Sequence, residues 1–370
     1  MCSSSTSSSA TAAKQPVKAG KQTTNLADSE GSPFHELGLA EVNEGMGRVR
    51  VRQHVNPLAS QYQQPTIIQD WAAVYADPSL PLFVDMGCGP GRFLLLLARR
   101  RQQQQQQQQR MNYLGLEIRQ PLIERASKWA EELGVSSNLV ERANKWAEEL
   151  GVSSNVHYEW TNVSVSLAAL LAAYPGPVST LAAQFPDPHF KKRHKKRRMV
   201  QASVVAAARE LLVPGGQVFL QSDVYNAAVS MRDEFEQYAG DVLQLSPLHS
   251  PASTFQWTPQ QEAAAAAASK QPSDVARRQQ QQQQHGDSSQ EDSASEATFS
   301  SSSSSEQHDS SDNVAAELDS ELLSSSEEQF VSSWAAGGWL VDNPLGVPTE
   351  REHYVTAQGG KVFRVLLVKQ

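Results

Sequence analysis

The chain has 370 residues, a formal net charge of −8 at pH 7 and a pI of about 5.6. Two cysteines and the absence of any run of eighteen apolar residues argue against a disulfide framework and against a membrane-spanning segment. This length would ordinarily form two domains, but long low-complexity tracts cannot bury a core, so we expect one. Residues 262–328 contain 14 acidic and three basic residues, a net charge of −11. Subtracting this from the whole-chain charge of −8 leaves a net charge of +3 for the rest of the chain.

Residues 1–45 are predicted to be a disordered extension. Residues 1–30 are rich in Ser, Thr and Ala, with three lysines and no acid before Asp28, which is typical of a transit peptide. They lack the apolar run of a secretory signal, so we do not expect secretion.

A predicted strand at residues 82–86 runs into a glycine turn, and an apolar helix starting near Phe93 follows. Gly87, Gly89 and Gly91 let the backbone approach a ligand closely, and the helix amino terminus offers unpaired N–H groups. After Asp85, this spacing resembles the cofactor turn of class I S-adenosylmethionine-dependent methyltransferases. A purely structural turn is the alternative at this point.

The next predicted strand, residues 112–117, ends in Glu117. A nucleoside-binding α/β unit needs an acid at the end of its second strand to accept hydrogen bonds from the ribose hydroxyls. Glu117 lies 26 residues after Gly91, and eight of these form the glutamine run at residues 102–109. The remaining spacing is close to the expected value of about twenty. The alternative is an exposed glutamate at a strand end.

A tandem copy follows, in which residues 124–138 reappear as residues 141–155 with Asn144 in place of Ser127. Each copy has the pattern of an amphipathic helix. A parallel crossover to the next strand, at residues 156–160, requires only one helix. We expect the surplus copy to extend or loop out on the outer face.

The segment Phe185-Pro186-Asp187-Pro188-His189-Phe190 precedes seven Lys or Arg side chains within residues 191–198. The prolines hold Asp187 in a rigid turn, where a carboxylate can serve as an active-site group or simply stabilise the turn. The cations are too dense for a self-supporting helix face, and they suit binding a polyanion such as RNA. A solvated run or a nuclear-localisation signal is the alternative.

The remaining core elements again alternate. We predict a strand near residues 178–185, a helix at 199–212, a turn at Pro214-Gly215-Gly216, a strand at 217–222, a helix near 226–239 and a closing strand at 361–369. This order predicts a doubly wound α/β sheet with helices on both faces and one antiparallel edge. Ligands of such sheets bind at the carboxyl ends of the strands. Alanine, glutamine and serine runs predict that the insert at residues 262–328 is disordered.

Four motifs together resemble the tRNA (guanine-N7)-methyltransferases: the turn from Asp85 to Gly91, residues 115–119, Phe185-Pro186-Asp187-Pro188 with its basic run, and residues 349–352. Residues 50–58 look like the start of the domain in bacterial and plastid-type members. The resemblance covers roughly residues 48–258 and 329–370. It implies a mostly parallel, seven-stranded Rossmann-like methyltransferase sheet, with the domain divided between residues 46–261 and 329–370.

The resemblance also implies the site residues. S-adenosylmethionine would contact Gly87, Glu117, Arg119, Asn162 and Asp187, and Asp187 would be the catalytic residue. Lys191, Asp223, Thr349 and Glu352 would bind the tRNA substrate. Guanine N7 carries a lone pair and no proton, so the reaction needs no strong general base. It needs in-line placement of two reactants and a negative group near the cation that forms on the purine.

The resemblance implies action without a helper subunit, as a monomer or homodimer, although an accessory subunit stays open. We expect no metal site, because the nine histidines lack metal-ligand spacing. The transit-like start favours the chloroplast, whereas the basic run would also serve a nuclear protein, and the cytoplasm is a further alternative. Two other functions stay open: methylation of another RNA or of a protein, and a non-catalytic tRNA-binding module.

Overall fold

The computed structural model describes residues 31–39, 55–104, 110–133, 155–189, 192–258, 260–261, 264 and 330–370. Several predictions lie outside these residues. They concern Lys191, the start of the chain to residue 30, the segment at 50–54, most of the second tandem copy and nearly all of the insert.

A seven-stranded sheet forms the centre of the molecule, in the order β3-β2-β1-β4-β5-β9-β6. The first five strands in this order are parallel, and β9 is antiparallel to both β5 and β6. The strands are β1 Leu82–Met86, β2 Asn112–Glu117, β3 Val156–Trp160, β4 Val178–Gln184, β5 Leu212–Ser222, β6 Leu243–Leu245 and β9 Phe363–Lys369. The predicted mostly parallel seven-stranded sheet is therefore confirmed.

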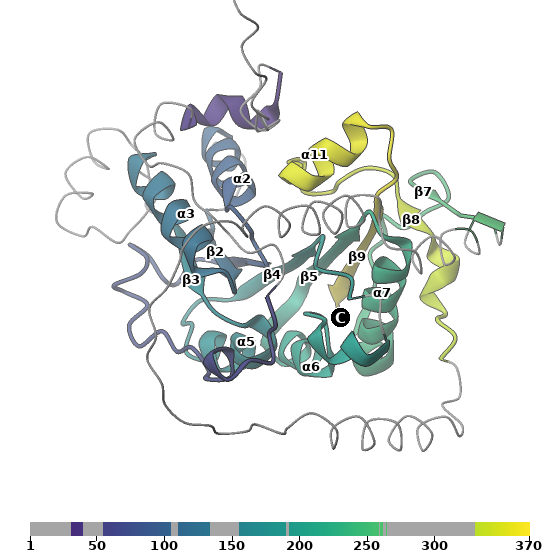
Figure 1. The fold of residues 1–370 in the computed structure, drawn as a ribbon, viewed down its shortest axis with the longest axis horizontal. Coiled ribbons are helices and arrows are strands. Elements are labelled where there is room, and N and C mark those ends of the chain that lie inside the picture. Colours follow the sequence, from purple (N-terminus) through teal and green to yellow (C-terminus); the bar gives the residue numbers. More distant parts are fainter. Residues whose placement is uncertain are drawn as a thin grey trace, which may run out of the picture.

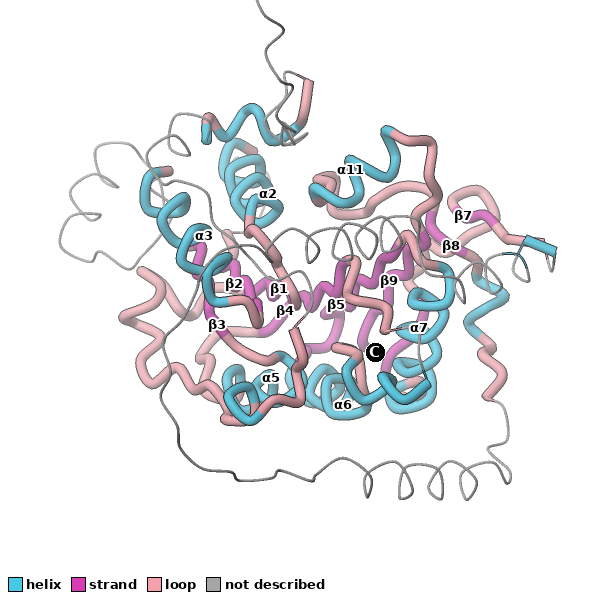
Figure 2. Tube along the Cα trace, viewed as in Figure 1, coloured by secondary structure: helices cyan, strands magenta, loops and turns pink. Residues whose placement is uncertain are grey.

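Helices cover both faces of the sheet (Figures 1 and 2). On one side lie α2 Arg92–Gln103, α3 Gln120–Glu132 and α11 Glu350–Ala357; on the other lie α5 Val163–Leu171, α6 Ala202–Leu211 and α7 Tyr225–Ala239. A separate apolar cluster fills each interface: Leu82, Val84 and Met86 of β1 face one, and Phe83 faces the other. This alternation along one buried strand is the doubly wound pattern.

The predicted antiparallel edge was wrong in position. The antiparallel strand β9 lies second from the edge, and the three-residue β6 outside it forms the edge itself. A strand this short carries no alternation of apolar and polar residues that a sequence pattern could reveal.

The predicted turn at Pro214-Gly215-Gly216 belongs to β5, which begins at Leu212 where the preceding helix was expected to end. Val178 pairs with Leu212 and Thr180 with Gln217, so the intervening residues of β5 form a bulge. Gly215 takes φ +78° there, a left-handed conformation that glycine adopts without strain.

Residues 31–39 pack on the domain, although the sequence predicted them as part of a disordered extension. They form the short 3-10 helix η2 Pro33–Leu37, which buries Phe34 and Leu37 against the α2 side of the sheet. Ser32 caps its start and Gly38 ends it at φ +66°. An ion pair of 3.0 Å joins Glu36 to Arg100 of α2. Apolar side chains at residues 34, 37 and 39 outweigh the polar composition around them.

Within the described residues, the crossover from β2 to β3 includes the helix α3. The first tandem copy begins within α3, which starts at Gln120 and ends at Glu132. The second copy lies outside the described residues apart from Asn155, whose side chain donates to the Met111 carbonyl over 2.7 Å.

Beside the sheet, β7 Thr254–Phe255 pairs with β8 Trp339–Leu340. These two strands flank the long insert in the sequence. The Glu236 carboxylate of α7 accepts hydrogen bonds from residues 332–334, including the Ser333 N–H at 2.8 Å. The two ends of the insert are therefore held at one place on the domain.

Candidate active site

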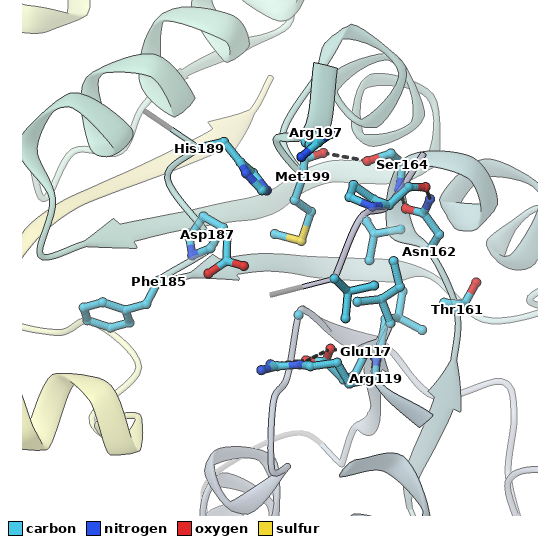
Figure 3. Close-up of a pocket in the computed structure, with 17 residues that line it drawn as sticks. Glu117, Arg119, Thr161, Asn162, Ser164, Phe185, Asp187, His189, Arg197 and Met199 are labelled. Atoms are coloured by element: carbon cyan, nitrogen blue, oxygen red, sulfur yellow. Dashed lines mark hydrogen bonds and ion pairs between the residues drawn. The ribbon is translucent and has the colours of Figure 1, made fainter. Parts of the chain in front are cut away.

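A pocket opens at the carboxyl ends of β1, β2 and β4, where the sequence predicted the ligand site (Figure 3). It brings together all five of the predicted cofactor residues, namely Gly87, Glu117, Arg119, Asn162 and Asp187. Its other lining residues are Val55, Pro57, Leu116, Ile118, Thr161, Val163, Ser164, Phe185, Pro186, His189, Arg197 and Met199.

The glycine turn lies beside the pocket and contributes Gly87 to its lining. Gly87, Gly89 and Gly91 have φ of +80°, +56° and +81°, so each lies in the left-handed region. A Cβ on Gly91 would lie 2.7 Å from the Tyr158 ring, whose hydroxyl donates to the Gly91 carbonyl over 2.6 Å. The turn is thus constrained both by its conformation and by the close approach of β3.

Glu117 is 3% exposed and connects the turn to Arg119. Its carboxylate accepts from the Gly89 N–H at 3.0 Å, from the Arg119 backbone N–H at 3.0 Å and from the Arg119 guanidinium at 2.9 Å through two nitrogens. Burial alone would lower the pKa of Arg119, but the bonds to Glu117 and the charges of Glu117 and Asp187 outweigh it and raise that pKa. Arg119 therefore stays cationic between two carboxylates.

Asn162 hydrogen-bonds to the segment at residues 57–62 beside the pocket. As the N-cap of α5, its side chain accepts from the Ser164 N–H. Its amide donates to the Pro57 and Tyr62 carbonyls, each over 3.1 Å. Asn162 thereby positions residues 57–62, while Val55 and Pro57 line the pocket.

Asp187 lies on a strained loop after β4. Phe185 at φ +52° and His189 at φ +41° are non-glycine residues in a region that glycine favours. Such strain concentrates at functional sites, where the surroundings enforce it. The Phe185 N–H donates to the Gln221 carbonyl over 2.8 Å, which ties the start of the loop to β5. Figure 3 shows the Asp187 carboxylate and the Met199 side chain directed toward the space above Glu117 and Arg119.

The basic run forms a short 3-10 helix, η4 Lys192–Arg197, where the sequence predicted that charge repulsion would prevent a self-supporting helix. External contacts hold it: Arg198 donates to the Ser230 hydroxyl at 2.8 Å, and the Gln201 amide donates to the Lys196 carbonyl at 3.1 Å. Lys195 and Lys196 are exposed, and Arg197 lines the pocket. A cationic surface therefore borders the pocket on the Asp187 side.

The predicted substrate residues of the carboxy-terminal motif have other partners. Thr349 and Glu352 form a capping box at the start of α11, and Glu352 is 4% exposed with Arg364 at 2.8 Å. Asp223 pairs with Arg351. None of these three predicted residues lines the pocket. In the structure they hold α11 on one face of the sheet, near the carboxyl end of β5.

The comparisons with known proteins are specific. Residues 79–274, more than half of the chain, match the model of the family described as "Putative methyltransferase". A tRNA (guanine-N(7)-)-methyltransferase of Synechococcus sp. (strain JA-3-3Ab) is 47% identical over 197 residues, which cover 53% of this chain and 72% of that protein. The one of Synechocystis sp. (strain ATCC 27184 / PCC 6803 / Kazusa) is 42% identical over 52% of this chain and 79% of its own.

The chain belongs to the tRNA (guanine-N7)-methyltransferase family. Among solved structures, "StiE O-MT residues 961-1257" matches at a TM-score of 0.29 and 14% identity, over 59% of this chain and 66% of its own. A structural similarity at that level supports no conclusion beyond those drawn from the strand order.

As a member of the tRNA (guanine-N7)-methyltransferase family, the protein uses S-adenosylmethionine as methyl donor. Its pocket suits that group: Gly87 lines it without a side chain, and the Glu117 carboxylate lies at the end of β2, where a ribose is bound in such sheets. Within the described part of the chain, no group of three or more His, Cys, Asp or Glu is placed to hold a metal ion. The helices of that part include none that is both long and apolar enough to cross a membrane.

The sequence reasoning missed several residues of this tRNA (guanine-N7)-methyltransferase site. Asp85 opens the glycine motif but was not proposed as a site residue. Burial is the main reason that its pKa rises to about 7; the Glu117 charge adds to this, while a hydrogen bond from Gln184 opposes it. Arg197 and Met199 line the pocket, and no spacing rule distinguishes them from the surrounding basic run.

Proposed function

We propose that this protein transfers the methyl group of S-adenosylmethionine to N7 of a guanine in tRNA. The observation that carries the proposal is the position of Asp187, which is exposed on a strained loop at the pocket and adjoins the cationic η4. The names of relatives that are 40–47% identical support the substrate.

The bound cofactor supplies an electrophilic methyl group on a sulfonium. In the transfer a bond forms from guanine N7 to the methyl carbon, the sulfur–carbon bond breaks, and the positive charge passes from sulfur to the purine. Asp187 can stabilise that developing cation, because a carboxylate already fixed beside the position where charge develops needs no reorganisation during the reaction. The strained loop holds it in place, so orientation is settled before the reaction.

The remaining residues of the site bind and orient. Glu117 offers a carboxylate to the ribose, and Asn162 fastens the segment above it. The exposed Lys195 and Lys196 suit contacts with phosphates, which position a nucleic acid without reading its sequence. Lys191, assigned to the substrate by the resemblance, lies outside the described residues.

We also propose that the protein acts in the chloroplast, as a monomer or homodimer. The composition of residues 1–30 supports the location. A fusion of residues 1–45 to a fluorescent protein tests it: signal confined to chloroplasts is expected, and diffuse cytosolic or nuclear signal would contradict it. Light scattering of the purified protein, with and without tRNA, would give the oligomeric state.

The reaction is tested with labelled S-adenosylmethionine and unmodified tRNA, followed by mapping of the product base. We expect label on guanine N7, and we expect Asp187→Ala to lower turnover about 100- to 1,000-fold. The matched control is Asp342→Ala, which removes an exposed aspartate outside the pocket lining and should retain full turnover. Label on another atom or on protein would contradict the substrate assignment, and full turnover of Asp187→Ala would contradict the role of that residue.

A further inference from the structure

A row of polar side chains crosses the buried face of the sheet beneath α11. Gln184 of β4 pairs in register with Gln221 of β5, and Gln221 pairs with Arg364 of β9, so the three side chains share one face. Asp85 of β1 pairs with Ala182, two residues before Gln184, and belongs to the same face. We call Asp85, Gln184, Gln221 and Arg364 the polar row.

Hydrogen bonds join the polar row without a gap. The Gln184 amide donates to Asp85 Oδ1 at 3.1 Å, and the Gln221 amide donates to Gln184 Oε1 at 2.8 Å and to Glu352 Oε2 at 3.1 Å. Arg364 donates to Gln221 Oε1 at 3.3 Å and to Glu352 Oε1 at 2.8 Å. This series of hydrogen bonds connects the Asp85 carboxylate, before the glycine turn, to the Glu352 carboxylate, which caps α11.

The chemistry of the acceptors dictates the orientation of both amides. The oxygens of Glu352 accept hydrogen bonds from Gln221 and Arg364, so Gln221 turns its NH2 group toward Glu352 and its oxygen toward Arg364. That NH2 also meets Gln184, which must therefore present its oxygen there and its own NH2 to Asp85. Each side chain in the series has its direction fixed by the one before.

Burial makes this series cooperative. Asp85, Gln184, Gln221, Glu352 and Arg364 are 3%, 7%, 0%, 4% and 6% exposed. A buried donor or acceptor that loses its partner costs free energy, so one broken link disturbs the others. Apolar residues, including Ala182, Phe219 and Leu366, occupy the same face nearby and show that packing alone does not demand polar groups there.

We propose that Gln184 and Gln221 are positioning residues that couple the position of Glu352 in α11 to the position of Asp85, which precedes the glycine turn. Through this coupling, the affinity for the cofactor depends on how α11 packs. Neither glutamine lines the pocket. The carboxy-terminal motif, through its Glu352, then acts on the cofactor turn at a distance. The inference needs only the cofactor, so it stands independently of the tRNA substrate.

The first test measures S-adenosylmethionine binding to the full-length protein by titration calorimetry. We expect Glu352→Gln and Gln221→Leu each to raise Kd about 3- to 30-fold, and the double variant to raise it no further than the weaker-binding single variant, because both act through one series. The matched control is Gln217→Leu, the same exchange four residues earlier on the same face of β5, with Kd within twofold of wild type. Unchanged single variants, or fold-changes that multiply in the double variant, would overturn the proposal.

A second measurement uses hydrogen exchange, and its wild-type result does not depend on the folding of any variant. In the wild-type protein, S-adenosylmethionine should slow exchange of the α11 amides at residues 350–357, although none of them lines the pocket. Gln217→Leu should keep this response and Gln221→Leu should lose it. Saturation with cofactor that leaves α11 exchange unchanged in the wild type would overturn the coupling, whereas failure of the wild type to bind cofactor would instead contradict the cofactor assignment.

Discussion

Replacing Glu117 by glutamine tests the cofactor site most directly. The carboxylate accepts four hydrogen bonds, from the Gly89 N–H and from three nitrogens of Arg119, at 2.9 to 3.0 Å. An amide has one oxygen and one NH2 group, so in either orientation the NH2 faces a backbone N–H and a guanidinium nitrogen, donor against donor. The variant also loses the charge that a ribose diol would meet.

The magnitude follows from these bonds. A hydrogen bond to a charged group contributes about 1.5–3 kcal/mol, so losing one such bond from the ribose should raise the Kd for S-adenosylmethionine about 10- to 150-fold. Calorimetry on Glu117→Gln gives this value, with thermal unfolding to establish that the variant is folded. Glu159→Gln is the control: that glutamate lies on neighbouring β3, pairs with His157 and is not in the pocket lining. A Glu117→Gln Kd within threefold of wild type would refute this reading of the site.

Two further predictions concern stability. Gly91→Ala should cost about 1–3 kcal/mol more than Gly215→Ala in urea denaturation, because both glycines have positive φ but only at Gly91 does a Cβ meet the Tyr158 ring and Ala126; equal losses would contradict the close-packing argument. Burial raises the folded-state pKa of Asp85 above its ordinary 3.8 to about 7, so its folded form binds the proton more tightly and stability should fall as pH rises from about 4 to 7. Asp85→Asn should remove that loss, gaining at most about 4 kcal/mol at pH 8; unfolding curves of both proteins between pH 5 and 8 that stay parallel would contradict it.

The sequence predicted the parallel part of the sheet and the cofactor side of the pocket well. Strands such as β1 and β2 are wholly buried, and their apolar runs end in polar residues or glycines that mark the boundary. Glu117 could be placed because the distance from the glycine turn is set by the geometry of one βαβ unit. Sequence patterns and spacing are enough to place a residue when its position depends on a single βαβ crossover.

The carboxy-terminal half of the site could not be predicted in this way. The partners of Glu352 come from β5, β9 and the loop after β8, and Arg92, the partner of Glu350, lies 258 residues away at the start of α2. No spacing in the sequence records such contacts, so the motif was interpreted only through the resemblance. Residues 31–39 were missed for a similar reason, since their three apolar side chains are buried only because the surface of α2 lies beside them.

The β7–β8 pair and the contacts of Glu236 have a consequence for how this protein tolerates change. They hold the segments before and after residues 262–328 next to each other on the domain. The length of the insert therefore does not change the positions of the strands that carry the pocket. Doubling the length of a flexible closed loop costs only about 0.6 kcal/mol. The position between β7 and β8 is therefore an insertion site, at which sequence can be added, removed or exchanged for a reporter domain while the seven strands keep their register.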